Sequence, residues 1–157
     1  MGGESVVEEV SRDDWILFLA GGCGLGALPV APGTWGTLGA LPLWFLLSGL
    51  SSGWYLLVVL LLSAGAVYIA DRAGRIFQVE DSPVIVIDEI VGLLLGLTGV
   101  SLGFGNALAA FLLFRFFDIV KPFPADWCDD NLGGGFGVVA DDLVAGLMTW
   151  LVMTIVF

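Results

Sequence analysis

The 157-residue sequence contains no histidine, only five lysine and arginine residues, and only two cysteines. The absence of histidine excludes Ser–His and Cys–His nucleophilic catalysis. Cys23 and Cys128 are too few for a disulfide framework or a cysteine-based zinc site. Nucleic-acid binding without sequence preference depends on basic side chains that displace counterions. Five basic residues against sixteen acidic ones therefore exclude a nucleic-acid partner.

Charged residues of either sign are also scarce. They make up 13% of the chain, about half the usual ~25%, whereas hydrophobic residues make up 58%. The mean hydropathy is +0.99. A soluble domain of this size cannot bury that much apolar surface. The composition therefore predicts an integral membrane protein whose partner is the lipid bilayer.

The hydrophobic segments predict an all-α, polytopic membrane helix bundle. Residues 1–14 are polar and acidic, and we expect a tail or a short helix there. Residues 15–157 are expected to form a single membrane-embedded catalytic domain with four or five transmembrane helices. It would start with a glycine-rich re-entrant or interfacial segment at 15–31, too short for a clear span. The expected helices are 37–50, 54–70, 84–100, 105–120 and 138–157, joined by a turn-rich loop at 32–37 and by polar loops at 71–82 and 121–137.

The few basic residues predict the orientation of the chain. Loops that carry lysine and arginine stay on the cytoplasmic side of a membrane. Arg12, the loop with Arg72 and Arg75, and the loop with Lys121 should therefore share that side. This orientation brings the 32–37 loop and most of the intramembrane acids to the same face.

Carboxylates within apolar helices are costly, about 2.5–3.5 kcal/mol each on insertion scales, so they are candidates for function. Asp88 shares a helical face with small residues that permit close helix packing, and so does Asp142. Each should therefore point into the bundle. The small residues are Gly92, Gly96 and Gly99 for the first, and Ala145, Gly146 and Thr149 for the second.

Structural roles remain open for several of these residues. Glu89 and Asp141 could face water at helix ends, and Arg115 with Asp118 could form an ion pair without catalytic function. The 32–37 loop could be only a turn, and the glycines at 133–137 only a connector. The acids of the 121–137 loop are expected to be solvated: Asp126, Asp129 and Asp130.

Four motifs in this order resemble the phosphatidylglycerophosphatase A family of bacterial membranes. They are Pro32-Gly33-Thr34, Asp88-Glu89, the run from Phe114 to Pro124, and Gly135-Phe-Gly137 followed by Asp141-Asp142. The resemblance covers about residues 15–157. It implies a magnesium-dependent lipid phosphatase that hydrolyses phosphatidylglycerophosphate to phosphatidylglycerol and inorganic phosphate. It also implies a multi-pass protein of the bacterial cytoplasmic (inner) membrane, with its active site near the cytoplasmic face.

The residues are compatible with that activity. The lack of histidine excludes histidine-based lipid phosphatases, and no Asp-x-Asp motif occurs, so a carboxylate-held metal remains. Mg²⁺ prefers carboxylate oxygens together with water and substrate phosphate. We expect Asp88, Asp142 and one or both of Glu89 and Asp141 to hold it.

The other site residues would act on the phosphate. Lys121, the Gly33 amide and the Thr34 hydroxyl are expected to contact it. Arg115 would either bind phosphate in a bidentate manner or orient Asp118. Asp118 would be a metal ligand, the base for the attacking water, or a nucleophile.

Two other functions compete with the phosphatase. An ion-coupled transporter also has intramembrane carboxylates and broken helices, but here the acids lie near helix ends and no duplicated halves are found. A non-catalytic membrane scaffold would not need Asp88, Asp118 and Asp142 on packing faces together.

Overall fold

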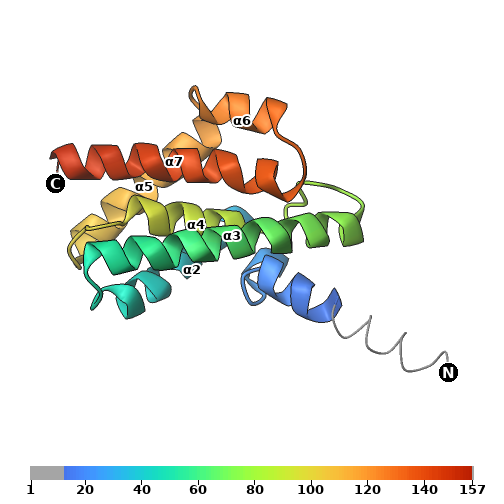
Figure 1. Cartoon of the computed structure of the whole chain (residues 1–157), viewed down its shortest axis with the longest axis horizontal. Coiled ribbons are helices and arrows are strands. Elements are labelled where there is room, and N and C mark those ends of the chain that lie inside the picture. The colour runs from blue at the N-terminus through green and yellow to red at the C-terminus, as the bar shows by residue number, and fades with distance from the viewer. Residues whose placement is uncertain (1–12, 157) are drawn as a thin grey trace.

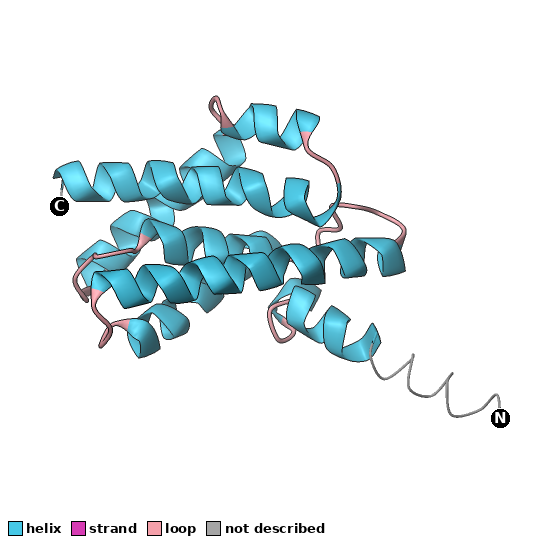
Figure 2. Ribbon diagram, viewed as in Figure 1, coloured by secondary structure: helices cyan, strands magenta, loops and turns pink. Residues whose placement is uncertain are grey.

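The described part of the chain is built from helices and contains no strand. The structure, a computed structural model, describes residues 13–156. Residues 1–12 of the predicted acidic tail therefore lie outside the described residues. Residues 13–20 form a first helical segment. Figures 1 and 2 show the elements that follow. They are the 3₁₀ turn η1 (Leu25–Ala27) and helices α2 (Pro32–Leu47), α3 (Ser52–Phe77), α4 (Ile87–Gly96), α5 (Phe104–Val120), α6 (Ala125–Asn131) and α7 (Gly134–Val156).

The short helix α4 lies at the centre of the bundle. It packs against α2, α3, α5 and α7, and Figure 1 shows it between α3 and α7. Its residues from Val91 to Gly96 are all buried. A helix that is apolar on every side belongs inside a protein core. With ten residues it is about 15 Å long, so it reaches only part of the way across a bilayer.

Glycines bring α4 and α7 into close contact. A Cβ atom at Gly92 would lie 2.7 Å from the backbone oxygen of Asp142, and one at Gly96 would lie 3.0 Å from Cγ2 of Thr149. A Cβ at Gly146 would overlap the backbone of Gly92. Small residues permit this approach of two backbones. The contact places the first turn of α4 directly beside the second and third turns of α7.

An irregular segment leads into α4 within the protein. The backbone N–H of Val86 donates to the carbonyl of Ala20 at 2.9 Å, and Ile85 and Val86 are buried. A Cβ at Gly26 would overlap the Val84 carbonyl, so the segment around η1 covers this stretch. Non-helical backbone at membrane depth is tolerated where protein surrounds it. The start of α4 is therefore held inside the bundle.

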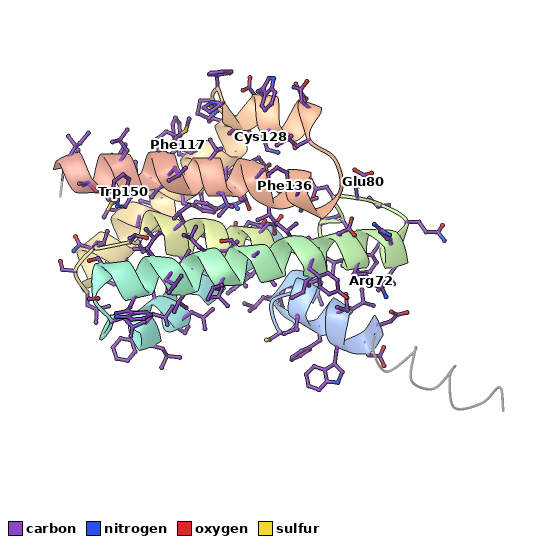
Figure 3. The ribbon with its side chains drawn as sticks, in the orientation of Figure 1. Arg72, Glu80, Phe117, Cys128, Phe136 and Trp150 are labelled. Carbon is purple, nitrogen blue, oxygen red and sulfur yellow. The ribbon has the colours of Figure 1, made fainter. Side chains whose placement is uncertain are left out.

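The protein has the surface of a membrane-associated molecule. Within residues 13–156, two helices, α3 and α7, are long and apolar enough to cross a bilayer. Large apolar side chains are exposed on several helices, including Phe45, Leu61, Phe104, Ile119 and Ile155. The labelled polar residues Arg72 and Glu80 lie at the end of the molecule away from Trp150 (Figure 3). The predicted all-α class is confirmed. Four or five transmembrane helices were predicted, and α3 and α7 are the two described helices that are long and apolar enough to cross a bilayer.

Two segments predicted as loops are helical. The 32–37 segment forms the first turns of α2, because Pro32 stands at the first helical position, where its missing N–H costs nothing. The polar stretch from residue 71 continues α3 to Phe77, because polar residues extend a helix readily where it leaves the apolar region. Gln78, the residue after the last residue of α3, adopts a left-handed backbone conformation with φ 56 and ends the helix.

The other boundaries also differ from those expected. The predicted span 84–100 contains only the ten-residue helix α4, since residues 84–86 are irregular. The predicted loop 121–137 contains α6, which packs against α7 (Figure 1). The glycines at 134–137 are not a flexible connector but the first turn of α7, and a Cβ at Gly135 would overlap the α3 backbone.

Candidate active site

A polar cleft of about 440 Å³ lies where α2, α4, α5 and α7 meet. The first turn of α2, the loop before α4, the first turn of α4, the last turns of α5 and the second turn of α7 all contribute to it. It is lined by Ala31, Pro32, Gly33, Asp81, Pro83, Ile85, Asp88, Glu89, Arg115, Asp118, Ile119, Lys121, Val138, Asp141 and Asp142. Most of the predicted site residues thus share one cleft, although they come from segments far apart in the sequence.

Three carboxylates of the cleft lie close together. Asp88, Glu89 and Asp142 each offer one oxygen, and these oxygens lie within 4.8 Å of one another. Asp88 and Asp142 are buried. Oδ1 of Asp88 and Oε2 of Glu89 are buried and have no hydrogen-bond partner within the described chain. Buried charges without partners are costly, and three hard oxygen donors this close match the coordination preference of Mg²⁺.

The helix geometry explains how these carboxylates meet. Asp88 and Glu89 stand in the first turn of α4, where the partial positive charge of the helix N-terminus favours carboxylates. Asp142 comes from the third turn of α7. It reaches α4 because Gly92 permits contact with the backbone of α7 at this level. The metal-compatible group therefore depends on the packing of α4 against α7.

Lys121 carries one of the two positive charges of the cleft. Its Nζ donates to Oδ2 of Asp141 and to Oδ1 of Asp129, both at 2.8 Å. Burial by itself would lower the pKa of Lys121, but the hydrogen bonds to Asp129 and Asp141 outweigh it and raise the pKa above its usual value. Lys121 has φ 44 and ends α5, just before Pro122. The lysine is therefore a fixed and permanently protonated group at a helix end.

Arg115 carries the other positive charge. Its Nη1 forms an ion pair with Asp118 of the same helix and donates to Oγ1 of Thr37 at 3.4 Å. The Thr37 hydroxyl in turn donates to the Gly33 carbonyl at 2.7 Å. A Cβ at Gly33 would overlap Oε1 of Glu89 and would lie 3.2 Å from Nη1 of Arg115. The first turns of α2 thus touch both an acidic and a basic group of the cleft.

One predicted site residue lies apart from the others. Thr34 is partly buried in α2, but it does not line the cleft. The threonine that contacts Arg115 is Thr37, within the same motif and four residues after Gly33. Residues four apart share a face only in a helix, so this spacing indicates that Thr37 lies beside Gly33 only if the 32–37 segment is helical.

Two further acids at the cleft or beside Lys121 were not predicted as site residues. Asp81 lines the cleft from the loop before α4. Asp129, expected to be solvated, pairs with Lys121, because α6 folds back beside α7 and faces the end of α5. Neither residue has a local pattern that would have indicated these positions. Asp126 and Asp130 are exposed, as expected.

The fold and the cleft define a class of protein: an all-α, membrane-associated protein whose interior gathers carboxylates that could hold a metal ion, beside one lysine and one arginine. The comparisons with known proteins specify the family. The family model for phosphatidylglycerophosphatase A matches residues 18–157, and the chain belongs to this family. The predicted membership is thereby confirmed, together with the enzyme class that it carries, a phosphomonoester hydrolase of lipid metabolism.

Relatives with curated names agree. The chain is 39% identical to phosphatidylglycerophosphatase A of Escherichia coli (strain K12), over 83% of this chain and 77% of the relative. It is 38% identical to the Haemophilus influenzae protein of the same name, over 94% of this chain and 91% of the relative. A Bacteroides thetaiotaomicron protein with the provisional name phosphatidylinositol-3-phosphatase is 36% identical over 93% and 96%. No solved structure matches the chain significantly.

Proposed function

We propose that this cleft hydrolyses the terminal phosphomonoester of phosphatidylglycerophosphate, with Mg²⁺ held by Asp88, Glu89 and Asp142. The observation that carries the proposal is the group of three converging carboxylates, two of them with buried and unpartnered oxygens. Lys121 and Arg115 line the same cleft. The family membership identifies the lipid, and the products would be phosphatidylglycerol and inorganic phosphate.

The charge of the cleft supports a bound cation. Two basic residues and six carboxylates line it, and the six are Asp81, Asp88, Glu89, Asp118, Asp141 and Asp142. A phosphate dianion would be repelled by this excess of negative charge. Bound Mg²⁺ supplies the missing positive charge and offsets the charge that develops on the phosphate. The buried Oδ1 of Asp141, which has no partner within the described chain, is a further ligand candidate.

The remaining residues would bind the phosphate and move a proton. Lys121 acts as a point charge, and Arg115 offers a planar pair of donors. The first turn of α2 lines the cleft with Gly33, and helix N-termini favour anions. Thr34 stays a predicted phosphate contact.

Asp118 is the candidate for the proton transfer or the covalent step. As a base it would take the proton of the attacking water while the phosphorus–oxygen bond to the glycerol breaks, and the leaving glycerol oxygen would take up a proton from Asp118 or from water. As a nucleophile it would first carry the phosphoryl group, which water then releases. As a further metal ligand it would help to hold the ion. Its ion pair with Arg115 keeps the carboxylate at the cleft in each case.

The location proposed is the bacterial inner membrane, crossed several times, with the cleft near the cytoplasmic face. Arg72 and Arg75 stand near the end of α3, and Lys121 lies at the cleft, which fits the positive-inside rule. Asp142 stands eight residues after the start of α7, about 12 Å along that helix. A cleft at this depth is within reach of a lipid headgroup.

The test uses the purified full-length protein in detergent micelles. Phosphate release is measured from phosphatidylglycerophosphate with Mg²⁺, and again after chelation. Asp88→Asn is compared with Asp126→Asn, which removes the same charge from an exposed site outside the cleft. We expect release to stop in chelator and in Asp88→Asn, and to persist in Asp126→Asn. No release by the wild-type protein would overturn the proposal.

The same assay separates the two lipid substrates named among the relatives. Phosphatidylinositol 3-phosphate is offered in parallel at equal surface concentration, since one relative carries that name. Faster release from phosphatidylglycerophosphate is expected. Faster release from the inositol lipid would keep the lipid phosphatase chemistry but overturn the proposed substrate.

A further inference from the structure

Thr37 is a buried threonine whose hydroxyl links α2 to Arg115. The residue is fully buried, and its hydroxyl donates its only proton to the Gly33 carbonyl at 2.7 Å. The hydroxyl oxygen can therefore only accept from the Arg115 guanidinium, whose Nη1 lies 3.4 Å away. The bond to Gly33 thus fixes the direction of the contact with Arg115.

Arg115 has a competing partner on its own helix. Asp118, three residues later in α5, pairs with the same Nη1 atom. Without a second partner, the guanidinium would be free to follow the Asp118 carboxylate. Thr37 offers the same Nη1 a second partner, on the different helix α2. The guanidinium thus has partners on two helices, α2 and α5.

We propose that Thr37 is a positioning residue, which holds the Arg115 guanidinium in the orientation that binds the substrate phosphate. This inference rests on the proposed function, because it assigns Thr37 a role in the same reaction. Thr37 does not line the cleft, and the charged group of the cleft that it contacts is Arg115.

The substitution that tests this role is Thr37→Val, which removes the hydroxyl and keeps the branched shape. Thr37→Ser keeps the hydroxyl and should restore the contact. Thr149→Val is the matched control, because Thr149 is also fully buried in a helix and its hydroxyl also donates to a carbonyl four residues earlier, Ala145, at 2.8 Å. Among the described hydrogen bonds and ion pairs, Thr149 has no arginine partner.

The readout is the split between KM and kcat for phosphatidylglycerophosphate. Loss of a hydrogen bond to a charged group lowers affinity by about tenfold. We therefore expect Thr37→Val to raise KM by about that factor and to change kcat less. Thr37→Ser and Thr149→Val should stay within about twofold of the wild type. A purely structural role would affect Thr37→Val and Thr149→Val alike.

A double-mutant cycle with Arg115→Lys shows whether Thr37 acts through the guanidinium. In the Arg115→Lys protein, adding Thr37→Val should change KM by less than about twofold, because the contact is already lost. Additive effects would overturn the inference, as would an unchanged KM in Thr37→Val. If Thr37→Val does not fold, Thr37→Ala replaces it in the same cycle.

The two proposals fail in different ways. A wild-type protein without lipid phosphatase activity overturns the proposed function. An active wild type whose Thr37→Val variant behaves like Thr149→Val overturns only the role of Thr37.

Discussion

Lys121 and Asp141 form an ion pair between the end of α5 and the second turn of α7, with Nζ and Oδ2 2.8 Å apart. The two residues are twenty positions apart, separated by a proline-rich turn and the helix α6. The pair brings a fixed ammonium group to the edge of the carboxylate cluster. It thereby links the α5 side of the cleft to the α7 side.

Replacing Lys121 tests whether this charge serves catalysis. We predict that Lys121→Met lowers kcat for lipid phosphate release by about 10²–10³-fold, the usual effect of removing one electrostatic donor from an active site. Lys121→Arg, which retains a positive charge, should keep more of the activity. Equal loss in both variants would show that the ammonium geometry, rather than its charge, is required. Full activity in Lys121→Met would contradict the assigned role.

The second partner of Lys121 gives a finer prediction. The side chain of Asp129 is 45% exposed, against 9% for Asp141, so Asp129 is the partner that a phosphate displaces more easily. Exposed ion pairs are worth about 0–1 kcal/mol. Asp129→Asn should therefore lower KM by at most about fivefold. Asp130→Asn, the neighbouring exposed acid of α6, makes the same change in net charge and should leave KM unchanged. An equal shift in both variants would indicate a general charge effect.

Glycine at position 33 is required by the side chains that touch it. Gly33→Ala would place a methyl group against the Glu89 carboxylate and the Arg115 guanidinium. We predict a loss of activity of about tenfold or more with a folded protein, since small displacements of positioned groups are costly. Gly105→Ala changes the second residue of α5, where a Cβ meets nothing within 4 Å. Activity of the Gly105→Ala protein should equal that of the wild type, and a similar loss in both would contradict the argument.

The carboxylate cluster predicts that Asp142→Asn stabilises the protein without metal and removes the stabilisation by Mg²⁺. In chelator, Asp142→Asn should raise the thermal unfolding temperature, because it removes one of three like charges held close together. Mg²⁺ should then raise the unfolding temperature of the wild type but not that of Asp142→Asn, since a ligand stabilises the state that binds it. Asp126→Asn should respond to Mg²⁺ like the wild type. A metal-induced shift that persists in Asp142→Asn would place the ion elsewhere.

The contact between α4 and α7 predicts a difference between two glycines. Gly92→Ala should destabilise the protein by about 1–3 kcal/mol, because its Cβ would meet the Asp142 backbone and the Phe114 ring, both at 2.7 Å. Gly65→Ala, in the middle of α3 with nothing within 4 Å, should stabilise its helix by up to about 1 kcal/mol. Thermal unfolding in detergent measures both. A Gly92→Ala protein that is as stable as the Gly65→Ala protein would contradict the close packing.

Local pattern predicted most of the residues that line the cleft, but it did not predict the exact ends of the helices. Asp88 and Asp142 were predicted from the small residues on their helical faces, because close helix contact in lipid needs small residues wherever the partner lies. The span 84–100 was predicted too long, because the apolar residues Ile85 and Val86 are buried as irregular backbone rather than as helix. Hydropathy measures burial, and it does not distinguish the two.

The amino-acid sequence by itself determined the all-α class, the preference for a membrane, the family and the candidate carboxylates, because these follow from composition and from motifs within single segments. Only the tertiary structure decided which side chains meet. The contact of Thr37 with Arg115 and the pairing of Asp129 with Lys121 depend on how α2 packs near α5 and how α6 folds onto α7. Contacts between distant segments arise from the packing of whole helices, and no local spacing in the chain records them.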